Sequence, residues 1–178
     1  MKASSPVRIV NVFARVDFGI PLDLQKLSLR LPNAEYEPES APGLVVRTDS
    51  PRSCITIYRS GVARCTGCKS PQDVDLAIMR VWSLMRDVGE VVPKPTSEIR
   101  NIVCVFDVGQ PVDLARLAQT ERGLVEYEPE QFPGAILRPP PSGTVLLFGS
   151  GRVVVTGIKA VSEAEYLVTY VRQMVHLS

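Results

Sequence analysis

Long hydrophobic runs are absent from this chain of 178 residues. No apolar stretch reaches the roughly 18 residues that a membrane-spanning helix needs. The opening "MKASSPVR" also lacks the apolar segment of a secretory signal peptide. From these two absences we expect a soluble, intracellular protein.

An excess of charge of either sign is missing as well. The 20 lysine and arginine residues nearly balance the 19 aspartate and glutamate residues, which leaves a formal net charge of +1. Such a chain exerts no general electrostatic attraction on nucleic acids or membranes. Any anionic partner must therefore be held by local patches of positive charge.

Residues that support catalysis or metal binding are few. The only histidine is His176, and the four cysteines are Cys54, Cys65, Cys68 and Cys104. The "CTGC" pair has no second pair to complete a zinc site, so we expect its two cysteines to be small buried hydrophobic residues. No carboxylate pair, nucleophile with a base, or metal cluster occurs at usable spacing. An enzyme is therefore the least favoured class, and we expect no cofactor and no metal.

What the chain does contain is an internal repeat. The stretch "EYEPESAPG", which begins at Glu35, returns as "EYEPEQFPG" at Glu126. Likewise "IVNVFARVDFGIPLDL" returns as "IRNIVCVFDVGQPVDL", and the offset between copies is 90 or 91 residues. Self-similarity at a fixed offset indicates a duplicated structural unit. We predict two repeats, residues 6–91 and residues 98–178.

Each repeat predicts the same order of elements. A strand precedes a short helix that begins around Pro21, β-rich segments with turn signals follow, and a longer helix closes the repeat. Both closing helices show capping-box spacing, with Ser70 and Asp73 in the first repeat and Ser162 and Glu165 in the second. Their apolar stripes indicate that they cover one face of a sheet.

Helices that cover one sheet face leave the other face open. Side chains alternate along a strand, so Leu146 and Phe148 point to one side, and Val154 and Thr156 join them across the reversal. An exposed apolar sheet face is unusual in a monomer and indicates a binding surface.

Four features, in the same order in both repeats, resemble the core of the TATA-box-binding protein family. They are the strand with Asn11 or Asn101, the "YEPE" loop that ends in "PG", the hairpin "SGVARCTGCK" or "SGRVVVTGIK", and the closing helix. The match covers nearly the whole chain. It implies an α+β saddle, in which two pseudo-symmetric repeats form a curved antiparallel sheet of about ten strands with four helices on the convex face.

The resemblance also implies which residues contact DNA. The family lays its concave sheet face on the minor groove of double-stranded promoter DNA and pushes two phenylalanines per repeat into base steps. By position in the motif, the wedges of the second repeat are Phe132 and Phe148. The other implied minor-groove contacts are Asn11, Asn101, Val103, Leu146, Val154 and Thr156. The implied contacts to the DNA backbone are Arg47, Ser60, Thr66, Lys69, Arg138, Ser150, Arg152 and Lys159.

The first repeat departs from this pattern on the DNA-binding face. Ala41 and Tyr58 stand at the two wedge positions, where alanine cannot wedge and tyrosine must keep its hydroxyl hydrated or hydrogen-bonded. Phe13 crowds the groove floor. The remaining changes are Thr56 for leucine, Val62 for arginine and Arg64 for valine. We therefore expect weakened or altered TATA recognition by the first repeat, which is similar to the loss of wedge phenylalanines in kinetoplastid TATA-box-binding-protein-related factors.

Two functions follow from the resemblance. The favoured one is a general transcription initiation factor that binds the DNA minor groove and nucleates the pre-initiation complex, with its grip mainly in the second repeat. The alternative is a protein-interaction platform in an initiation complex, with little DNA bending of its own.

The resemblance implies protein partners for both functions. In the family the second "YEPE" loop contacts transcription factor IIB, and the first loop lies nearer transcription factor IIA. By this match Glu128, Glu130 and Gln131 are the expected contacts to a IIB-like protein, although a solvated turn accounts for the glutamates nearly as well. We also expect a IIA-like protein and other initiation-complex subunits as partners. The stretch "NAEYEPE" and the position of Arg47 favour a eukaryotic over an archaeal origin, so we expect a nuclear location.

Overall fold

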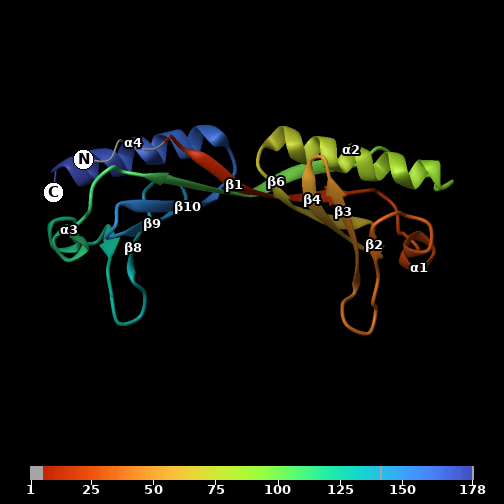
Figure 1. Cartoon of the computed structure of the whole chain (residues 1–178), viewed down its shortest axis with the longest axis horizontal. Coiled ribbons are helices and arrows are strands. Elements are labelled where there is room, and N and C mark those ends of the chain that lie inside the picture. The colour runs from red at the N-terminus through yellow and green to blue at the C-terminus, as the bar shows by residue number, and fades with distance from the viewer. Residues whose placement is uncertain (1–5, 141, 178) are drawn as a thin grey trace. The chain divides into compact units, whose positions relative to one another are not determined.

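The computed structural model describes residues 6–140 and 142–177 of the chain, which Figure 1 colours from one end to the other. By contacts the chain divides into two units. The first unit is Asn11–Arg100, and the second unit comprises the described residues up to Val10 together with the described residues from Asn101 onward. Both unit boundaries lie inside strands, whereas the repeat boundaries at 6–91 and 98–178 come from sequence similarity and stay a prediction.

The described residues form ten strands and four helices, the numbers predicted from the sequence. The helices are α1 (Leu24–Ser28), α2 (Pro71–Asp87), α3 (Leu114–Thr120) and α4 (Val161–Leu177). The strands of the first half of the chain are β1 (Arg8–Asp17), β2 (Ala34–Glu35), β3 (Gly43–Asp49), β4 (Arg52–Tyr58) and β5 (Val62–Cys68). The strands of the second half are β6 (Thr96–Asp107), β7 (Val125–Glu126), β8 (Gly134–Leu137), β9 (Thr144–Phe148) and β10 (Arg152–Ile158).

The strand order is β2-β3-β4-β5-β1-β6-β10-β9-β8-β7. Neighbouring strands within each unit pair antiparallel, as β3 does with β4 and β10 with β9. Short turns join β4 to β5 and β9 to β10, and the Ser-Gly dipeptides of the repeat lie in these two turns. No helix among the described residues is long and apolar enough to cross a membrane.

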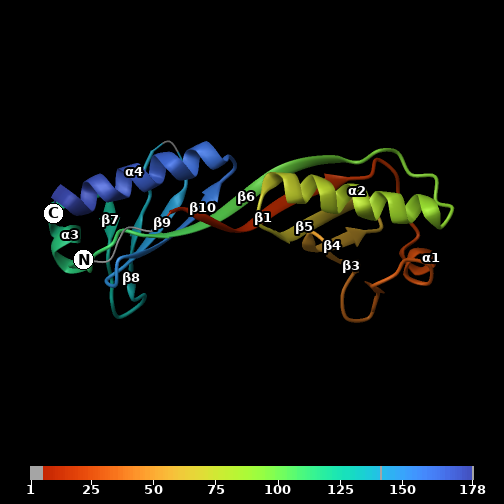
Figure 2. The ribbon, with the colours of Figure 1, turned by 45° about the horizontal axis from the view of Figure 1, so that its top comes forward.

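One face of each unit's strands is buried under its long helix. In the second unit Val145, Leu147, Val153 and Val155 are fully buried beneath α4, which packs on β10. In the first unit α2 packs on β4 and β5 in the same way (Figure 2). Burying one aliphatic side chain of this size contributes roughly 1.5–3 kcal/mol, so this layer makes a large contribution to the stability of each unit.

The short helices begin one turn later than the sequence prediction. The Oδ1 atom of Asp23 accepts a hydrogen bond of 3.0 Å from the backbone N–H of Lys26, so Asp23 is the N-cap and α1 begins at Leu24. The predicted start around Pro21 is therefore wrong. Because the Asp23 side chain caps the N-terminus, the helix cannot begin before this residue, and Pro21 lies in the preceding loop.

The two closing helices differ in how they are capped. The Oγ atom of Ser70 accepts a hydrogen bond of 3.0 Å from the backbone N–H of Asp73, which confirms the cap predicted for α2. The cap predicted for α4 at Ser162 is wrong, because that helix begins at Val161. Here the carboxylate of Glu163 reaches back to the backbone N–H groups that precede the helix.

Hydrogen bonds explain the charge state of this glutamate. The hydroxyl of Ser142 and the backbone N–H groups of Lys159 and Ala160 donate to the Glu163 carboxylate, and together they hold its pKa below the usual range. The ionised form satisfies N–H groups that have no partner inside the helix. The carboxylate therefore does the work that the sequence assigned to a serine hydroxyl.

The "CTGC" cysteines are part of the core. Cys65 and Cys68 are 0% and 1% exposed, and their sulfur atoms lie 3.9 Å apart. Burial raises the pKa of both thiols, so they stay protonated. The prediction that they pack as small hydrophobic residues is confirmed.

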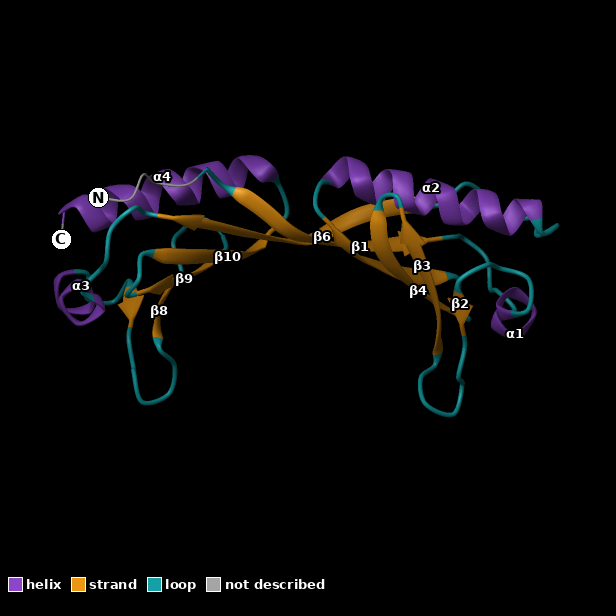
Figure 3. Ribbon diagram, viewed as in Figure 1, coloured by secondary structure: helices purple, strands orange, loops and turns teal. Residues whose placement is uncertain are grey.

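The repeated nine-residue motif lies at the same place in both units. It connects β2 to β3 in the first unit and β7 to β8 in the second, as the teal loops of Figure 3 show. In each unit the loop extends away from the long helix. We call residues 36–42 the first motif loop and residues 127–133 the second motif loop.

Candidate nucleic-acid interface

The second unit carries a continuous apolar surface on the sheet face opposite α4. Leu146 pairs with Val154 across β9 and β10, and Val154 pairs in turn with Val105 of β6. All of these side chains are half-buried, in contrast to their fully buried strand neighbours. The predicted alternation is thus correct. The half-buried residues on this face include Asn101, Val103, Val105, Ile136, Thr144, Leu146, Phe148, Val154 and Thr156.

Two phenylalanine rings stand beside this surface. Phe132 comes from the second motif loop and Phe148 from the end of β9, and their ring centroids lie 5.8 Å apart in an edge-to-face arrangement. Aromatic pairs of this geometry are favourable by about 0.5–1.5 kcal/mol beyond simple burial. Two rigid rings from separate segments are therefore held together before any partner binds.

A glycine makes this close approach possible. Gly134 pairs with Phe148 across β8 and β9. A Cβ atom at this position would lie 2.9 Å from Cε1 of Phe132 and 3.1 Å from Cε1 of Phe148. Any larger residue would push the rings apart.

The two repeated asparagines are oriented by backbone hydrogen bonds. The Oδ1 atom of Asn101 accepts a hydrogen bond of 2.7 Å from the backbone N–H of Gly157. In the first unit Oδ1 of Asn11 accepts one of 2.8 Å from the backbone N–H of Gly67. Because a backbone N–H can only donate, the oxygen of each amide is identified and the NH₂ group is the donor. In Asn101 the NH₂ group donates one hydrogen bond to Oγ1 of Thr156, and its second N–H remains for a partner.

These glycines lie in matching irregularities of the sheet. The register shifts between Val12 and Ala14 in one unit and between Val155 and Ile158 in the other. Gly157 has a φ of 78°, which lets its N–H turn toward the asparagine. The adjacent threonines, Thr66 and Thr156, also hydrogen-bond the asparagine side chains at 3.2–3.3 Å.

Two predicted DNA-backbone contacts are already in ion pairs. Nη2 of Arg47 lies 3.4 Å from Oε2 of Glu35, and Nη1 of Arg138 lies 2.6 Å from Oε1 of Glu126. All four side chains are more than half exposed. An exposed pair of this kind contributes at most about 1 kcal/mol, so each guanidinium is available to an anion that competes with the glutamate.

The other predicted DNA-backbone contacts lie at the ends of the strands and are exposed. Ser60 and Ser150 begin the turns before β5 and β10, while Lys69 and Lys159 follow the same two strands. They lie along the margins of the open faces, at two opposite ends of the strands. Thr66 alone among the predicted DNA-backbone contacts is half-buried, inside β5.

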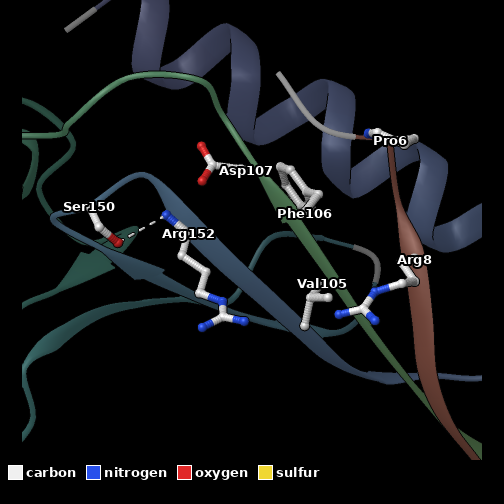
Figure 4. Close-up of a pocket in the computed structure, with 7 residues that line it drawn as sticks. All are labelled: Pro6, Arg8, Val105, Phe106, Asp107, Ser150 and Arg152. Carbon is white, nitrogen blue, oxygen red and sulfur yellow. Dashed lines mark hydrogen bonds between the residues drawn. The ribbon is translucent and has the colours of Figure 1, made fainter. Parts of the chain in front are cut away.

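The structure adds one cation to this set that sequence reasoning missed. Figure 4 shows Arg8 of β1 and Arg152 of β10 reaching toward the same space, with Val105 between them. They line a hollow of about 580 Å³ in the second unit. By the 90-residue offset, Arg8 belongs to the first repeat, and its counterpart in the second repeat is Glu98 rather than a cation. No sequence signal connects it to Arg152.

The open face of the first unit is built differently. Ala41 is exposed in the first motif loop, and no ring faces Tyr58 from that loop. Instead the guanidinium carbon of Arg64 lies 5.5 Å from the centroid of the Tyr58 ring. Phe13, the counterpart of Val103, is half-buried on the same face.

A second arginine on this face was also missed. Arg15 of β1 is the register partner of Arg64, and its counterpart is Val105. The 90-residue offset could have exposed this substitution, but only strand pairing places the two cations opposite each other. The first unit thus has charge where the second unit has valine.

The three predicted protein contacts lie together in the second motif loop. Glu128, Glu130 and Gln131 are all exposed, and the Gln131 side chain donates a hydrogen bond to Glu128. The loop is closed by a hydrogen bond of 3.0 Å from the backbone N–H of Phe132 to the carbonyl of Glu128. The same turn therefore presents carboxylates and positions an aromatic ring.

Comparison with known proteins gives a consistent result. A family model described as "Transcription factor TFIID (or TATA-binding protein, TBP)" matches residues 6–88 and again residues 96–176. The TATA-box-binding protein of Methanocaldococcus jannaschii is 42% identical over 168 residues, which cover 93% of this chain and 91% of the relative. That of Archaeoglobus fulgidus is 40% identical over 162 residues, with 89% and 88% covered.

A solved structure shows the same likeness in fold. The structure named "Methanococcus jannaschii TBP" superimposes with a TM-score of 0.86 and 38% sequence identity, and covers 98% of this chain and 100% of that one. The predicted α+β fold class, with ten antiparallel strands and four helices, is confirmed.

The ring pair can be tested through its glycine. We expect Gly134→Ala to lower the free energy of unfolding by about 1 kcal/mol, because the new methyl group overlaps both rings. Gly149→Ala is the matched control, since a Cβ atom there meets only the carbonyl of Val112 at 3.6 Å. Urea unfolding followed by circular dichroism measures both variants. Equal stability of the two variants would contradict the packing described for Gly134.

Proposed function

The chain belongs to the TATA-binding protein family, and on that premise we propose that it is a general initiation factor that grips the DNA minor groove mainly through its second unit. Members of this family are DNA-binding transcription factors and not enzymes, which confirms the non-enzymatic function expected from the sequence. The relatives named above are TATA-box-binding proteins. Promoter DNA is the corresponding ligand proposed for this chain.

One observation carries the proposal about the second unit. Its open face has two rings in contact, Phe132 and Phe148, while the equivalent positions of the first unit hold Ala41 and Tyr58. A kink requires an apolar wedge that unstacks a base step, at a cost of a few kcal/mol per step. A ring pair fixed in advance offsets that cost, because no ordering of the side chains remains to be done on binding.

Tyr58 is not an equivalent wedge. Arg64 lies over its ring, and a base that stacks on Tyr58 must displace that guanidinium. The phenol hydroxyl must also keep a hydrogen-bond partner when it leaves water. We therefore propose that the first unit holds DNA without kinking it.

Base selection is proposed to come from the two asparagines. Adenine N3 and thymine O2 are the acceptors of an A·T pair in the minor groove, and a G·C pair adds an amino donor there. The NH₂ groups of Asn11 and Asn101 complement the acceptors and not the donor. Their orientation, held by Gly67 and Gly157, supports selection of A·T-rich DNA.

Attachment to the DNA backbone is proposed to use the cations at the margins. Arg47 and Arg138 would exchange a glutamate for a phosphate, which costs little because the existing ion pairs are exposed. Arg8 and Arg152 would hold another phosphate in the second unit, where they line one hollow. Each such contact releases counterions, so affinity should fall steeply with salt.

The difference between the units predicts that restoring phenylalanine at the two wedge positions of the first unit strengthens DNA binding. We expect Ala41→Phe combined with Tyr58→Phe to bind a TATA duplex about tenfold more tightly and to bend it more, because the pair restores two wedges to the first unit. Fluorescence anisotropy measures the affinity, and energy transfer between dyes at the duplex ends measures the bend.

Phe132→Ala is the matched variant in the second unit. We expect it to lose both affinity and bend, since it removes one of the two rings already in contact. A native chain that binds and bends TATA DNA as strongly as the repaired variant would refute the weakened first unit.

A second role, contact with a IIB-like initiation factor, is favoured by the second motif loop. Its carboxylates at positions 128 and 130 are exposed while the backbone of the loop is closed by hydrogen bonds. A rigid turn that presents negative charge suits a basic partner surface. With DNA bending reduced, this role would make the protein a platform for assembly. A IIA-like protein would contact the first motif loop in the same way.

Charge reversal separates the two loops. We expect Glu128→Lys with Glu130→Lys to abolish capture of a IIB-like protein, because two attractive contacts become repulsive. The matched control is Glu37→Lys with Glu39→Lys, the same exchange in the first motif loop, which should leave capture intact. A pull-down on immobilised promoter DNA measures both. Capture that survives in the second-loop variant would count against the proposed contact.

The location and lineage stay predictions. The expected nuclear location came from "NAEYEPE" and Arg47, whereas the relatives named above are archaeal. The similarity to kinetoplastid factors likewise depends on the wedge positions alone.

A further inference from the structure

The most unusual feature of the first unit is a pair of like charges directly opposite each other on neighbouring strands. Arg15 of β1 and Arg64 of β5 are register partners. In the second unit the equivalent pair is Val105 and Val154. Like charges in this arrangement destabilise a sheet, so the exchange of two valines for two arginines has a cost that the fold alone does not require.

Two neighbours reduce this cost without removing it. Nη2 of Arg15 lies 2.9 Å from Oδ2 of Asp17, and Arg64 lies over the ring of Tyr58. A hydrogen bond from the backbone N–H of Gly19, together with the bond from Arg15, holds the pKa of the Asp17 carboxyl below its usual range. The carboxylate pairs with Arg15, whereas Arg64 has a ring as its neighbour, and both arginines are exposed. The cluster keeps an excess of positive charge.

The place of the cluster in the sheet indicates which part of DNA it meets. β1 and β5 are neighbours in the interior of the strand order, whereas Arg47 lies on β3 next to the short edge strand β2. Arg64 is in the middle of β5, on the face that carries Thr56 and Tyr58. In the proposed complex this is the floor of the interface, which faces base edges, while phosphates lie at the margins.

We propose that Arg15 and Arg64 read a narrow minor groove, so that the first unit selects an A-tract where the second unit selects a step that kinks. The inference rests on the proposed binding of DNA. A-tracts are stiff, and their narrow minor groove has an enhanced negative potential that attracts inserted arginines. A face without wedges leaves that groove narrow. In the first unit, the two arginines and the absence of wedges therefore both favour a narrow minor groove.

Asp17 is the anion that DNA must displace from Arg15 in this arrangement. It holds the Arg15 guanidinium on the open face through Oδ2 while Oδ1 accepts from Gly19 in the turn. Bound DNA would compete with Asp17 for Arg15. Asp17→Asn keeps an acceptor for Gly19 and removes the competing charge.

The test uses the full chain and two duplexes of equal length. One has flexible pyrimidine–purine TA steps in both halves, and the other has an A-tract in one half and TA steps in the other. We expect the native chain to prefer the A-tract duplex by about tenfold, which corresponds to the discrimination of one good side-chain contact to a base. Fluorescence anisotropy at fixed salt gives both dissociation constants.

The informative variant is Arg15→Val combined with Arg64→Val. It copies the valine pair that the second unit already contains in the same register, so the sheet should fold normally. We expect its preference for the A-tract duplex to fall below about twofold, because the charge readout is lost. Asp17→Asn should instead increase the preference. Arg80→Val is the control for loss of an arginine away from the open face, because Arg80 is exposed on α2 and lies on the covered side of the sheet.

The outcomes separate this inference from the function it depends on. A native chain that binds neither duplex would overturn the proposed function. A native chain that binds both equally, or a double valine variant that keeps the preference of the Arg80→Val control, would overturn the A-tract readout and leave DNA binding intact. If the double valine variant kept its preference for the A-tract duplex but no longer captured an initiation factor, the cluster would belong to a protein partner. That result would also overturn the A-tract readout.

Discussion

Burial of every second strand residue beneath a long helix is the constraint on which the rest of each unit depends. Val145, Leu147, Val153 and Val155 have no exposed surface, and a shift of register by one residue would turn all of them to solvent. The same constraint determines which residues lie on the open face. That face has no helix to cover it, so its composition is decided by what it must bind.

Two copies of one scaffold have therefore acquired different surfaces. Exchanges such as Ala41 for Phe132 and Arg64 for Val154 fall on positions that contribute little to the core. The buried strand residues and the asparagine–glycine hydrogen bonds are kept in both units. One unit presents a pair of rings and the other presents charge, and a family whose members bind DNA offers a single explanation for both.

Sequence patterns predicted what depends on periodicity and spacing. Strand alternation, the order of elements and the cap at Ser70 were correct because each is a local property with its own signal. The cap by Glu163 was missed because the residue before the helix, Ala160, is an alanine, and alanine has no side-chain group that marks an N-cap. Arg15 and Arg8 were missed for a different reason. Their partners are set by strand pairing, and a lone arginine in a strand reads as a solvated residue until its neighbour across the sheet is known.

The central claim is that only the second unit kinks DNA. A fluorescent adenine analogue, 2-aminopurine, becomes brighter when its base step is unstacked. It can be placed in a bound TATA duplex at the base step that faces the first unit or at the one that faces the second unit. The account predicts a rise in fluorescence at one step, and loss of that rise in Phe132→Ala. Equal rises at both steps in the native complex would contradict it.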